Sequence, residues 1–460
     1  MNWASASEIA RAVAAGEQSA VSVTDAALAR IERLNPKLNA FTDVTAERAQ
    51  AKARVLDQTR QGGKPLGPLA GVPFAVKNLF DIEGLPTRAG SKINRRHPKA
   101  GRDATLIERL EAAGAVLVGG LNMGEYAYDF TGENVHDGPS RNPHDLSRMT
   151  GGSSGGSGGA VAGGLVPLAL GSDTNGSIRV PASFCGIFGL KPTYGRLSRA
   201  RTFPIVASLD HLGPLARNVR DLTLSYDAMQ GHDPDDPVCA DRPHEPAASQ
   251  LGRGTRGLRM AMAGGYFRKN LFGEARQAME RVATALGVDR EIEIPEAERA
   301  RSAAYVITAT EGAALHLERL RQQARDFDPA VRDRLIAGAL VPAAMITQAQ
   351  QFRRWYRERV LELFREVDVI LAPATPCAAP AIGQQTFVLD GVETPLRPNI
   401  GIHTQPISFI GLPVVAVPVP LKPLPIAVQI IAAPWREDVV LRVADTLEQS
   451  GVAVAQQPGL

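Results

Sequence analysis

The sequence predicts an α/β protein in which one large β-sheet is covered by helices on both faces. Short apolar runs at 71–78, 115–120 and 165–173 are bounded by Gly and Pro, as buried strands are. A helical pattern at 103–113 separates two of these runs, and strands that alternate with helices indicate a sheet with both faces covered. With 460 residues, 44% of them apolar, the chain is long enough to bury a sizeable core.

The first part of the chain is predicted to be helical. Ser5 with Glu8, and Ser22 with Asp25, each fit a capping box, in which two side chains satisfy free backbone N–H groups at a helix start. Apolar residues also recur near helical spacing in this region. We therefore expect residues 1–65 to form a helical N-terminal layer.

A helical insertion is predicted to interrupt the sheet. Beyond a stretch rich in Pro, Asp and His, helical periodicity is found at 274–286, 296–323 and 343–367. Strand-like runs are found at 258–264, 368–373 and 413–420. Because strand patterns return after the helices, one interrupted sheet explains this order better than two independent domains do.

We accordingly expect a single domain over residues 1–460. Its parts beyond the N-terminal layer are predicted as a catalytic core at 66–230, a mostly helical, substrate-side insertion at 231–367, and a C-terminal return to the sheet at 368–460.

Composition and charge exclude several classes of protein. The net charge of +3 is spread over arginines that alternate with acids, so we expect no nucleic-acid partner. Cys185, Cys239 and Cys377 are odd in number and lack metal-ligand spacing, which argues against disulfides and against a metal site. We find no signal peptide and no apolar run of membrane-spanning length, so a cytoplasmic enzyme without membrane contact is predicted.

The glycine- and serine-rich segment 151–182 is the strongest indication of chemistry. Glycine clusters are retained where backbone N–H groups must approach a ligand closely. Ser177 follows a predicted strand, and the N–H groups of Thr174, Asn175 and Gly176 can converge beside its hydroxyl. This pattern predicts a nucleophilic serine next to an oxyanion hole.

Spacing alone does not identify the base that activates this serine. Two G-x-S-x-G matches, at 151–155 and 155–159, would fit a nucleophile elbow, but the segment before them is polar and turn-like. Lys77 ends an apolar strand, where burial would favour its neutral form and let it act as a base. Its position fits a lysine that reaches the surface from a strand end equally well.

Three motifs in the same order resemble the amidase signature family. They are LAGVPFAVKN, GGSSGGSGGA and ALGSDTNGSIRVPASFCGIFGLKPTYGR. The resemblance implies the amidase-signature fold and a triad of Lys77, Ser153 in a cis peptide linkage, and Ser177, which forms an acyl-enzyme. It further implies an oxyanion hole made by the N–H groups of residues 174–177, including that of Ser177, and no metal or organic cofactor.

Departures from the family pattern point to the substrate. Asn175 stands where the family usually has glycine, which puts an amide side chain beside the scissile group. Arg325 and Arg332, with Arg334 nearby, are candidates for binding an anionic substrate, although a solvated helix face is the default for such residues. Within the family, the resemblance implies deamination of 1-carboxybiuret to urea-1,3-dicarboxylate and ammonia, in s-triazine (cyanuric acid) catabolism.

Three alternatives remain open at this point. The chain could be a broad-specificity acylamide amidase, a glutaminyl-tRNA amidotransferase-type amidase subunit, or a non-catalytic scaffold subunit. The resemblance to amidotransferase subunits implies a small helical accessory partner, and a homodimer or hetero-oligomer is the expected assembly. The expected ligand is a small-molecule amide.

Overall fold

The computed structural model describes residues 3–460, and within them eleven strands form one mixed sheet. The strand order is β1-β3-β2-β6-β8-β7-β14-β15-β11-β9-β10. Neighbours pair in parallel at β3-β2-β6 and at β11-β9-β10, and antiparallel elsewhere. The predicted α/β class, with one large mixed sheet, is confirmed.

The strands of this sheet are β1 (Phe41–Val44), β2 (Pro73–Lys77), β3 (Val116–Leu121), β6 (Leu168–Asp173), β7 (Phe188–Lys191), β8 (His211–Ala216), β9 (Met260–Ala263), β10 (Glu291–Ile292), β11 (Val369–Pro373), β14 (Val414–Val419) and β15 (Ile426–Ala432). Two small hairpins lie outside it, β4 (Arg141–Asn142) with β5 (Asp145–Met149), and β12 (Thr386–Leu389) with β13 (Val392–Pro395).

The α-helices of the described chain are α1 (Ala6–Ala14), α2 (Ala20–Leu38), α3 (Ala46–Gln61), α4 (Thr105–Ala112), α5 (Gly155–Ala162), α6 (Arg179–Cys185), α7 (Val219–Met229), α8 (Gly273–Leu286), α9 (Ala297–Gln323), α10 (Pro329–Ala339), α11 (Ala343–Leu363), α12 (Leu396–Asn399), α13 (Gln405–Ser408) and α14 (Glu437–Gln449). Short 3-10 turns connect several of them.

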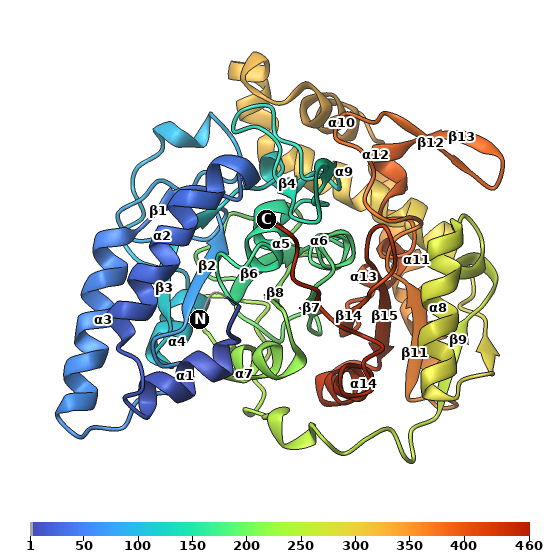
Figure 1. The fold of residues 1–460 in the computed structure, drawn as a ribbon. Helices are drawn as coiled ribbons and strands as arrows, with labels where there is room; N and C mark the ends of the chain where they lie inside the picture. The colour runs from blue at the N-terminus through green and yellow to red at the C-terminus, as the bar shows by residue number, and fades with distance from the viewer. Residues whose placement is uncertain (1–2) are drawn as a thin grey trace.

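The central strands are buried along their whole length, which requires cover on both faces of the sheet. Helices α5 and α6 pack on each other and on these strands, as α7 and α14 also do. Figure 1 shows the sheet running across the molecule between the blue N-terminal helices and α8. The core therefore lies in two layers, one on each side of the sheet.

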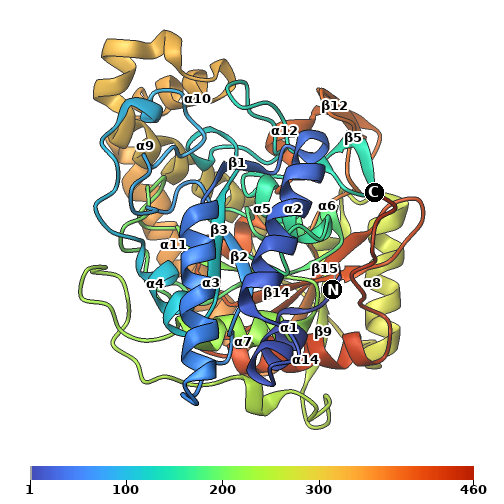
Figure 2. The same cartoon turned by 60° about the vertical axis from the view of Figure 1, so that its left-hand side comes forward.

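Three helices of the predicted insertion, α9, α10 and α11, pack together, whereas its helix α8 lies against the strands β11 and β15. Helix α9 packs against both α10 and α11, and Figures 1 and 2 show α9 and α10 at the top, beyond the strand ends. The proposed borders at residues 65, 230 and 367 stay a prediction. What the packing establishes is that α9 and α10 lie next to the loops that follow the strands.

The N-terminal helices begin partly where the sequence predicts. The Ser5–Glu8 capping box is present at the start of α1. The predicted box at Ser22 and Asp25 is wrong, because α2 begins at Ala20 and the Ser19 side chain accepts the Ser22 N–H at 3.0 Å. Figure 2 shows α2 and α3 side by side, and the short strand β1 between them in sequence was not predicted.

Several elements escaped prediction because packing overrides their composition. Helix α5 has four glycines in eight residues, yet it is buried from end to end between the sheet and α6. Strands β7 and β8 contain Gly, Pro or Lys, which are poor strand formers, and both are held by neighbours on each side. Burial in the sheet supplies the stability that their own sequences lack.

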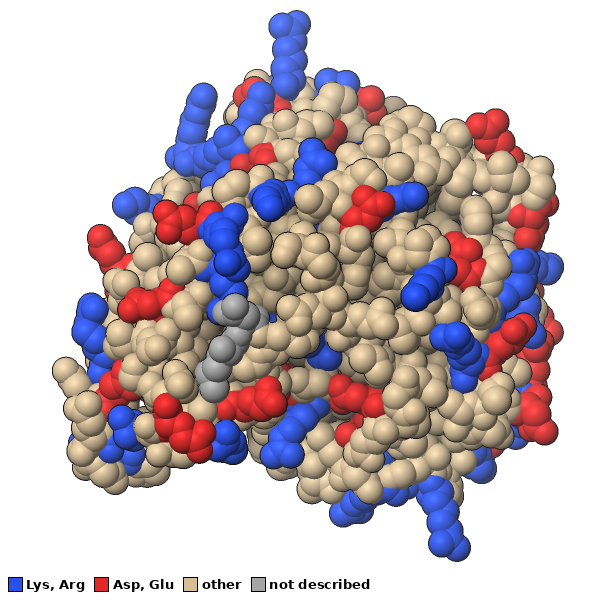
Figure 3. All heavy atoms as spheres, in the orientation of Figure 1, with Lys and Arg blue, Asp and Glu red and all other residues tan. Residues whose placement is uncertain are grey.

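The visible surface carries both charges without separation. Figure 3 shows Lys and Arg interspersed with Asp and Glu over the face that it presents. None of the helices within residues 3–460 combines the length and apolar character needed to cross a membrane.

Candidate active site

The end of strand β2 places Lys77 in the interior of the protein, completely shielded from solvent. Its Nζ lies 2.6 Å from Ser153 Oγ and 2.9 Å from Ser172 Oγ. Burial lowers the pKa of the amine to about 7, against the opposing effect of nearby carboxylates such as Asp173. A substantial fraction of this lysine is therefore neutral near pH 7 and able to accept a proton.

Ser153 lies just before helix α5, at the start of the glycine-rich segment. The peptide bond between Gly152 and Ser153 is cis. The backbone carbonyl of Ser153 accepts the Gly124 N–H at 3.2 Å, and the residue is fully buried. This arrangement presents the Ser153 hydroxyl to the Lys77 amine.

Ser177 lies in the turn between β6 and α6, with only 3% of its surface exposed. No hydrogen bond in the described part of the chain joins its hydroxyl to that of Ser153. Such contacts often form only once a substrate is bound. Ser177 does line a cavity, which Lys77 and Ser153 do not.

A buried ion pair fixes the turn that carries Ser177. The Arg179 guanidinium donates from Nε to Asp173 Oδ2 and from Nη2 to Asp173 Oδ1, each at 3.0 Å. Burial alone would raise the pKa of Asp173, but the charge and hydrogen bonds of Arg179 bring it well below its ordinary value. Asp173 also accepts the Ile178 N–H, so one carboxylate ties both ends of the turn.

The backbone of the turn is held from the other side by Thr404. Its hydroxyl donates to the carbonyl oxygen of Asn175 at 2.7 Å. Gly176 has φ +140°, and a Cβ there would lie 2.2 Å from Thr404 Oγ1, so only glycine fits. The Thr174 hydroxyl donates to Asp210 Oδ1 at 2.5 Å. These bonds keep the backbone N–H groups of the turn in a fixed arrangement, as an oxyanion hole requires.

A small cavity lies in front of Ser177, and we call it the active-site cavity. Its lining residues are Ala127, Tyr128, Asp129, Phe130, Thr174, Asn175, Ser177, Ile205, Tyr305, Thr308, Arg334 and Gln405. The turn after β6 thus forms one wall, and α9 with α10 contributes another.

Of the arginines considered from the sequence, the structure brings Arg334 to this cavity. Its guanidinium lies 4.0 Å from the centre of the Tyr128 ring and donates to the Tyr128 carbonyl oxygen. Arg325 is exposed in a 3-10 turn and Arg332 pairs with Asp333, so neither lines the cavity. Helical periodicity explains the difference, because Arg332 and Arg334, two positions apart, point to different sides of α10.

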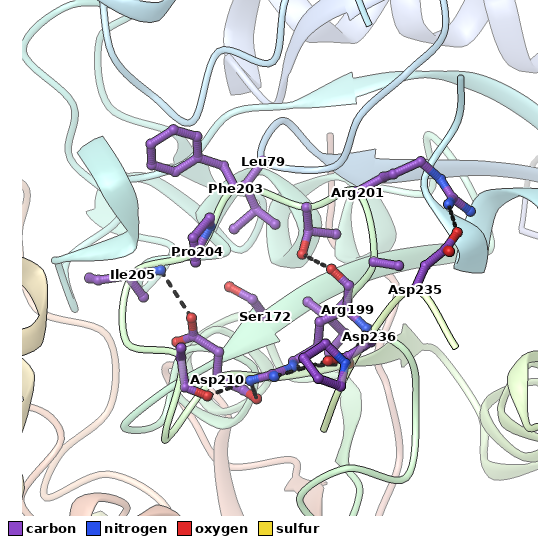
Figure 4. Close-up of a pocket in the computed structure, with 15 residues that line it drawn as sticks. Leu79, Ser172, Arg199, Arg201, Phe203, Pro204, Ile205, Asp210, Asp235 and Asp236 are labelled. Carbon is purple, nitrogen blue, oxygen red and sulfur yellow. Dashed lines mark hydrogen bonds and ion pairs between the residues drawn. The ribbon is translucent and has the colours of Figure 1, made fainter. Parts of the chain in front are cut away.

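A second, larger cavity is shown in Figure 4. Ser172 lines it, whereas Ser177 does not, and Ile205 lines both cavities. In Figure 4, Arg201 lies against Asp235, and Asp210 accepts the Ile205 N–H. Because Ser177 faces the other cavity, we take the active-site cavity as the one that holds substrate.

Sequence reasoning missed three residues that shape the site, namely Ser172, Thr308 and Thr404. Ser172 lies on β6, the neighbour of β2, and this pairing brings it to Lys77. The adjacent motif GSDT was a usable signal for Ser172. Thr308 and Thr404 come from segments more than 130 residues away from Asn175, and no local pattern marks either of them.

Comparison with known proteins decides the family. A model of the family described as Amidase matches residues 22–441. This chain belongs to the amidase family. The amidase-signature resemblance of its three motifs is thereby confirmed, and with it the assignment of the chain as an amidohydrolase.

Individual relatives of this amidase match over nearly its whole length. It is 54% identical over 449 residues to AtzE, a 1-carboxybiuret hydrolase subunit of Pseudomonas sp. strain ADP, covering 97% of this chain and 98% of that protein. It is 37% identical over 480 residues to a glutamyl-tRNA(Gln) amidotransferase subunit of Chloroflexus aurantiacus, covering 98% and 97%.

A solved structure agrees closely with this amidase. It belongs to a vestigial protein complex that reveals the evolutionary origins of an s-triazine catabolic enzyme. The TM-score is 0.97 at 54% identity, and the match covers 98% of this chain and 100% of the other. The amidase-signature fold is therefore confirmed.

Proposed function

We propose that this amidase hydrolyses the terminal amide of 1-carboxybiuret, giving urea-1,3-dicarboxylate and ammonia in s-triazine catabolism. The observation that carries the proposal is the buried Lys77–Ser153 contact beside a cavity that Ser177 lines. The substrate is suggested by the 54% identical relative, which is a 1-carboxybiuret hydrolase subunit.

In the proposed mechanism, Ser177 attacks the amide carbonyl. A neutral Lys77 accepts the Ser153 proton across 2.6 Å, while the Ser153 oxygen accepts the proton of the Ser177 hydroxyl. The Ser177 Oγ–carbon bond forms, and the carbonyl electrons move to oxygen. The Ser172 hydroxyl oxygen accepts a hydrogen bond from Lys77 Nζ at 2.9 Å, and this bond orients the amine toward Ser153.

The tetrahedral intermediate then collapses as the carbon–nitrogen bond breaks. The proton held by Lys77 returns through Ser153 to the leaving nitrogen, which departs as ammonia. Water attacks the acyl carbonyl and gives its proton to the same relay. The Ser177 Oγ–carbon bond then breaks, and the relay returns that proton to the Ser177 oxygen. We assign the oxyanion to the N–H groups of residues 174–177, whose turn is held by Asp173 and Thr404.

Arg334 is the residue that we propose for the anionic end of the substrate. It lines the active-site cavity, and its charge is opposite to that of a carboxylate. Helix α10 holds it in place, because the Glu125 carboxylate accepts the Asp328 N–H at the start of that helix at 2.7 Å. A substrate with an amide at one end and a carboxylate at the other fits this distribution of charge.

We further propose a cytoplasmic location and a small helical accessory subunit. Support for the partner comes from the solved relative, which was found in a protein complex. Co-purification of the tagged chain from a native host, followed by mass determination, tests this part separately from the activity.

The substrate proposal is tested by ammonia release from a panel of amides. The panel contains 1-carboxybiuret, biuret, allophanate, malonamate, and long-chain and aryl amides, each assayed with wild type and with Ser177→Ala. We expect turnover of 1-carboxybiuret and a loss on the order of 10⁶-fold in the variant. Activity confined to long-chain or aryl amides would contradict the substrate, and equal activity in Ser177→Ala would contradict the mechanism.

A second candidate is an amidase subunit that supplies ammonia to an amidotransferase. It is favoured by the 37% identity to such a subunit over 98% of this chain. Glutamine added to the same panel separates the two candidates. Glutaminase activity well above the activity on 1-carboxybiuret would favour this alternative.

A further inference from the structure

The side-chain amide of Asn175 has a hydrogen-bond partner for its nitrogen but, in the described part of the chain, none for its oxygen. Its Nδ2 donates to Thr308 Oγ1 on α9 at 2.9 Å. Its Oδ1 is buried and has no hydrogen-bond partner among the described residues. The residue is only 8% exposed, and it lines the active-site cavity together with Ser177. A buried carbonyl oxygen without a donor is costly, so such an atom calls for a donor from elsewhere.

Three hydroxyl groups of the surrounding residues donate to other acceptors. The Thr174 hydroxyl donates to Asp210, and the Tyr305 hydroxyl donates to the Pro398 carbonyl at 2.5 Å. The Thr404 hydroxyl donates to the backbone of Asn175 itself. A ligand that occupies the cavity is therefore a source of the missing donor.

The position of Asn175 limits which ligand atom it can meet. It lies two residues before Ser177 in the same turn, and the turn is fixed through Asp173 and through the Gly176–Thr404 contact. A side chain held so close to the nucleophile faces the atoms attached to the scissile carbonyl rather than the far end of the substrate. In a ureido compound one of those atoms is an N–H, whereas in an ordinary carboxamide it is a CH₂.

We propose that Asn175 is a specificity-determining residue whose Oδ1 accepts the internal N–H of a ureido substrate. It thereby selects O=C–NH compounds over amides that have carbon next to the scissile carbonyl. This inference rests on the proposed function and adds the chemical class of substrate that the site selects. Thr308 is a positioning residue, because its hydroxyl oxygen accepts the Asn175 Nδ2–H and so leaves Oδ1 without that partner.

Two pairs of isosteric compounds test the proposal. Biuret and malonamide differ only in N–H against CH₂ next to the scissile carbonyl, and allophanate and malonamate differ in the same way. The measured quantity is the ratio of kcat/KM within each pair, since the change in this ratio on mutation cancels their different intrinsic reactivities. We expect Asn175→Ala to lower the N–H to CH₂ ratio by about tenfold or more.

Three further variants sharpen the result. Asn175→Asp retains an acceptor, so the ratio should be kept although both rates fall. Thr308→Val frees the amide, so the ratio should fall by less than in Asn175→Ala. Thr310→Val is the matched control, because that buried hydroxyl donates only to carbonyls of its own helix, Val306 and Ile307, and the ratio should not change.

The outcomes separate this inference from the proposed function. If wild type turns over 1-carboxybiuret and Asn175→Ala lowers both members of each pair equally, Asn175 does not read the internal N–H and the inference is overturned. The same holds if Asn175→Asp loses the ratio as fully as Asn175→Ala does. Wild type that leaves 1-carboxybiuret intact but hydrolyses biuret overturns the substrate instead, and the ratios still decide the role of Asn175.

Discussion

The turn after β6 and the helices α9 and α10 form two walls of one cavity, and they are built in different ways. At the turn, Asp173 and Arg179 are buried and bonded to each other, and Thr404, which lies just before α13, is bonded to the backbone of the turn. On the helices, three arginines pair with a neighbour at the surface, as Arg332 does with Asp333. The first wall is held by buried bonds, whereas the second wall contributes a few inward-facing side chains from helices that also carry solvated residues.

This difference teaches how chemistry and specificity are divided in the molecule. Buried charges must be paired and hydrogen-bonded, so a change at one position of the turn disturbs all of it. A helix tolerates changes on its outer face, and a residue there matters only if its direction brings it to the cavity. Substitutions that disturb the backbone of the turn should therefore reduce the rate for every substrate. Substitutions of side chains that face the cavity, such as Asn175 in the turn and Arg334 on α10, should alter the choice among substrates.

The largest expected effect tests the reacting side of this comparison. Lys77→Met should lower kcat/KM by about 10⁴-fold for all amides, because the base is lost. Methionine also removes the cost of burying an amine, so the thermal midpoint at pH 7 should not fall. Ammonia release and a thermal melt measure both, and a variant that retains half of its activity would show that Lys77 is not the base.

The pH dependence of the wild type follows from the same lysine. Its pKa is about 7, and only the neutral amine accepts a proton. Below that pH the protonated fraction rises, so kcat/KM should fall by nearly tenfold per pH unit, and above it the rate should level off. A profile that is flat between pH 5 and 8 would contradict the assignment.

A smaller effect, about 10²-fold in kcat, is expected for Gly176→Ala. The new Cβ would collide with Thr404 Oγ1 and displace the N–H groups of the turn. The loss should be similar for biuret and for 1-carboxybiuret, since the oxyanion is common to both. A change confined to one of these substrates would break the distinction between the two walls.

The smallest effect is expected on the helical wall. Arg334→Gln should raise KM for 1-carboxybiuret by about tenfold and leave biuret nearly unchanged, because only the former carries a carboxylate. Arg332→Gln, on the same helix but outside the cavity, is the control and should change neither. Equal effects of the two substitutions would mean that Arg334 does not bind the substrate carboxylate.

Prediction from the sequence succeeded where a residue's surroundings are encoded nearby. The run before Lys77 is apolar, and burial duly lowers its pKa. Ser177 and the residues before it lie in one turn, so their proximity follows from the sequence. The roles of Lys77, Ser153 and Ser177 remain predictions until the variants are assayed. Local pattern failed for Ser22, where α2 begins three residues earlier at a different cap.

The sequence by itself determined the α/β class, the family and the segment that carries the nucleophile, because strand and helix periods and contiguous motifs are local properties. Only the tertiary structure decided that Thr308 meets Asn175, that Thr404 supports the turn, and that Arg334 rather than Arg325 or Arg332 lines the cavity. Those contacts join segments far apart in the chain. Their geometry depends on how α9 and α10 pack, which no short stretch of sequence encodes.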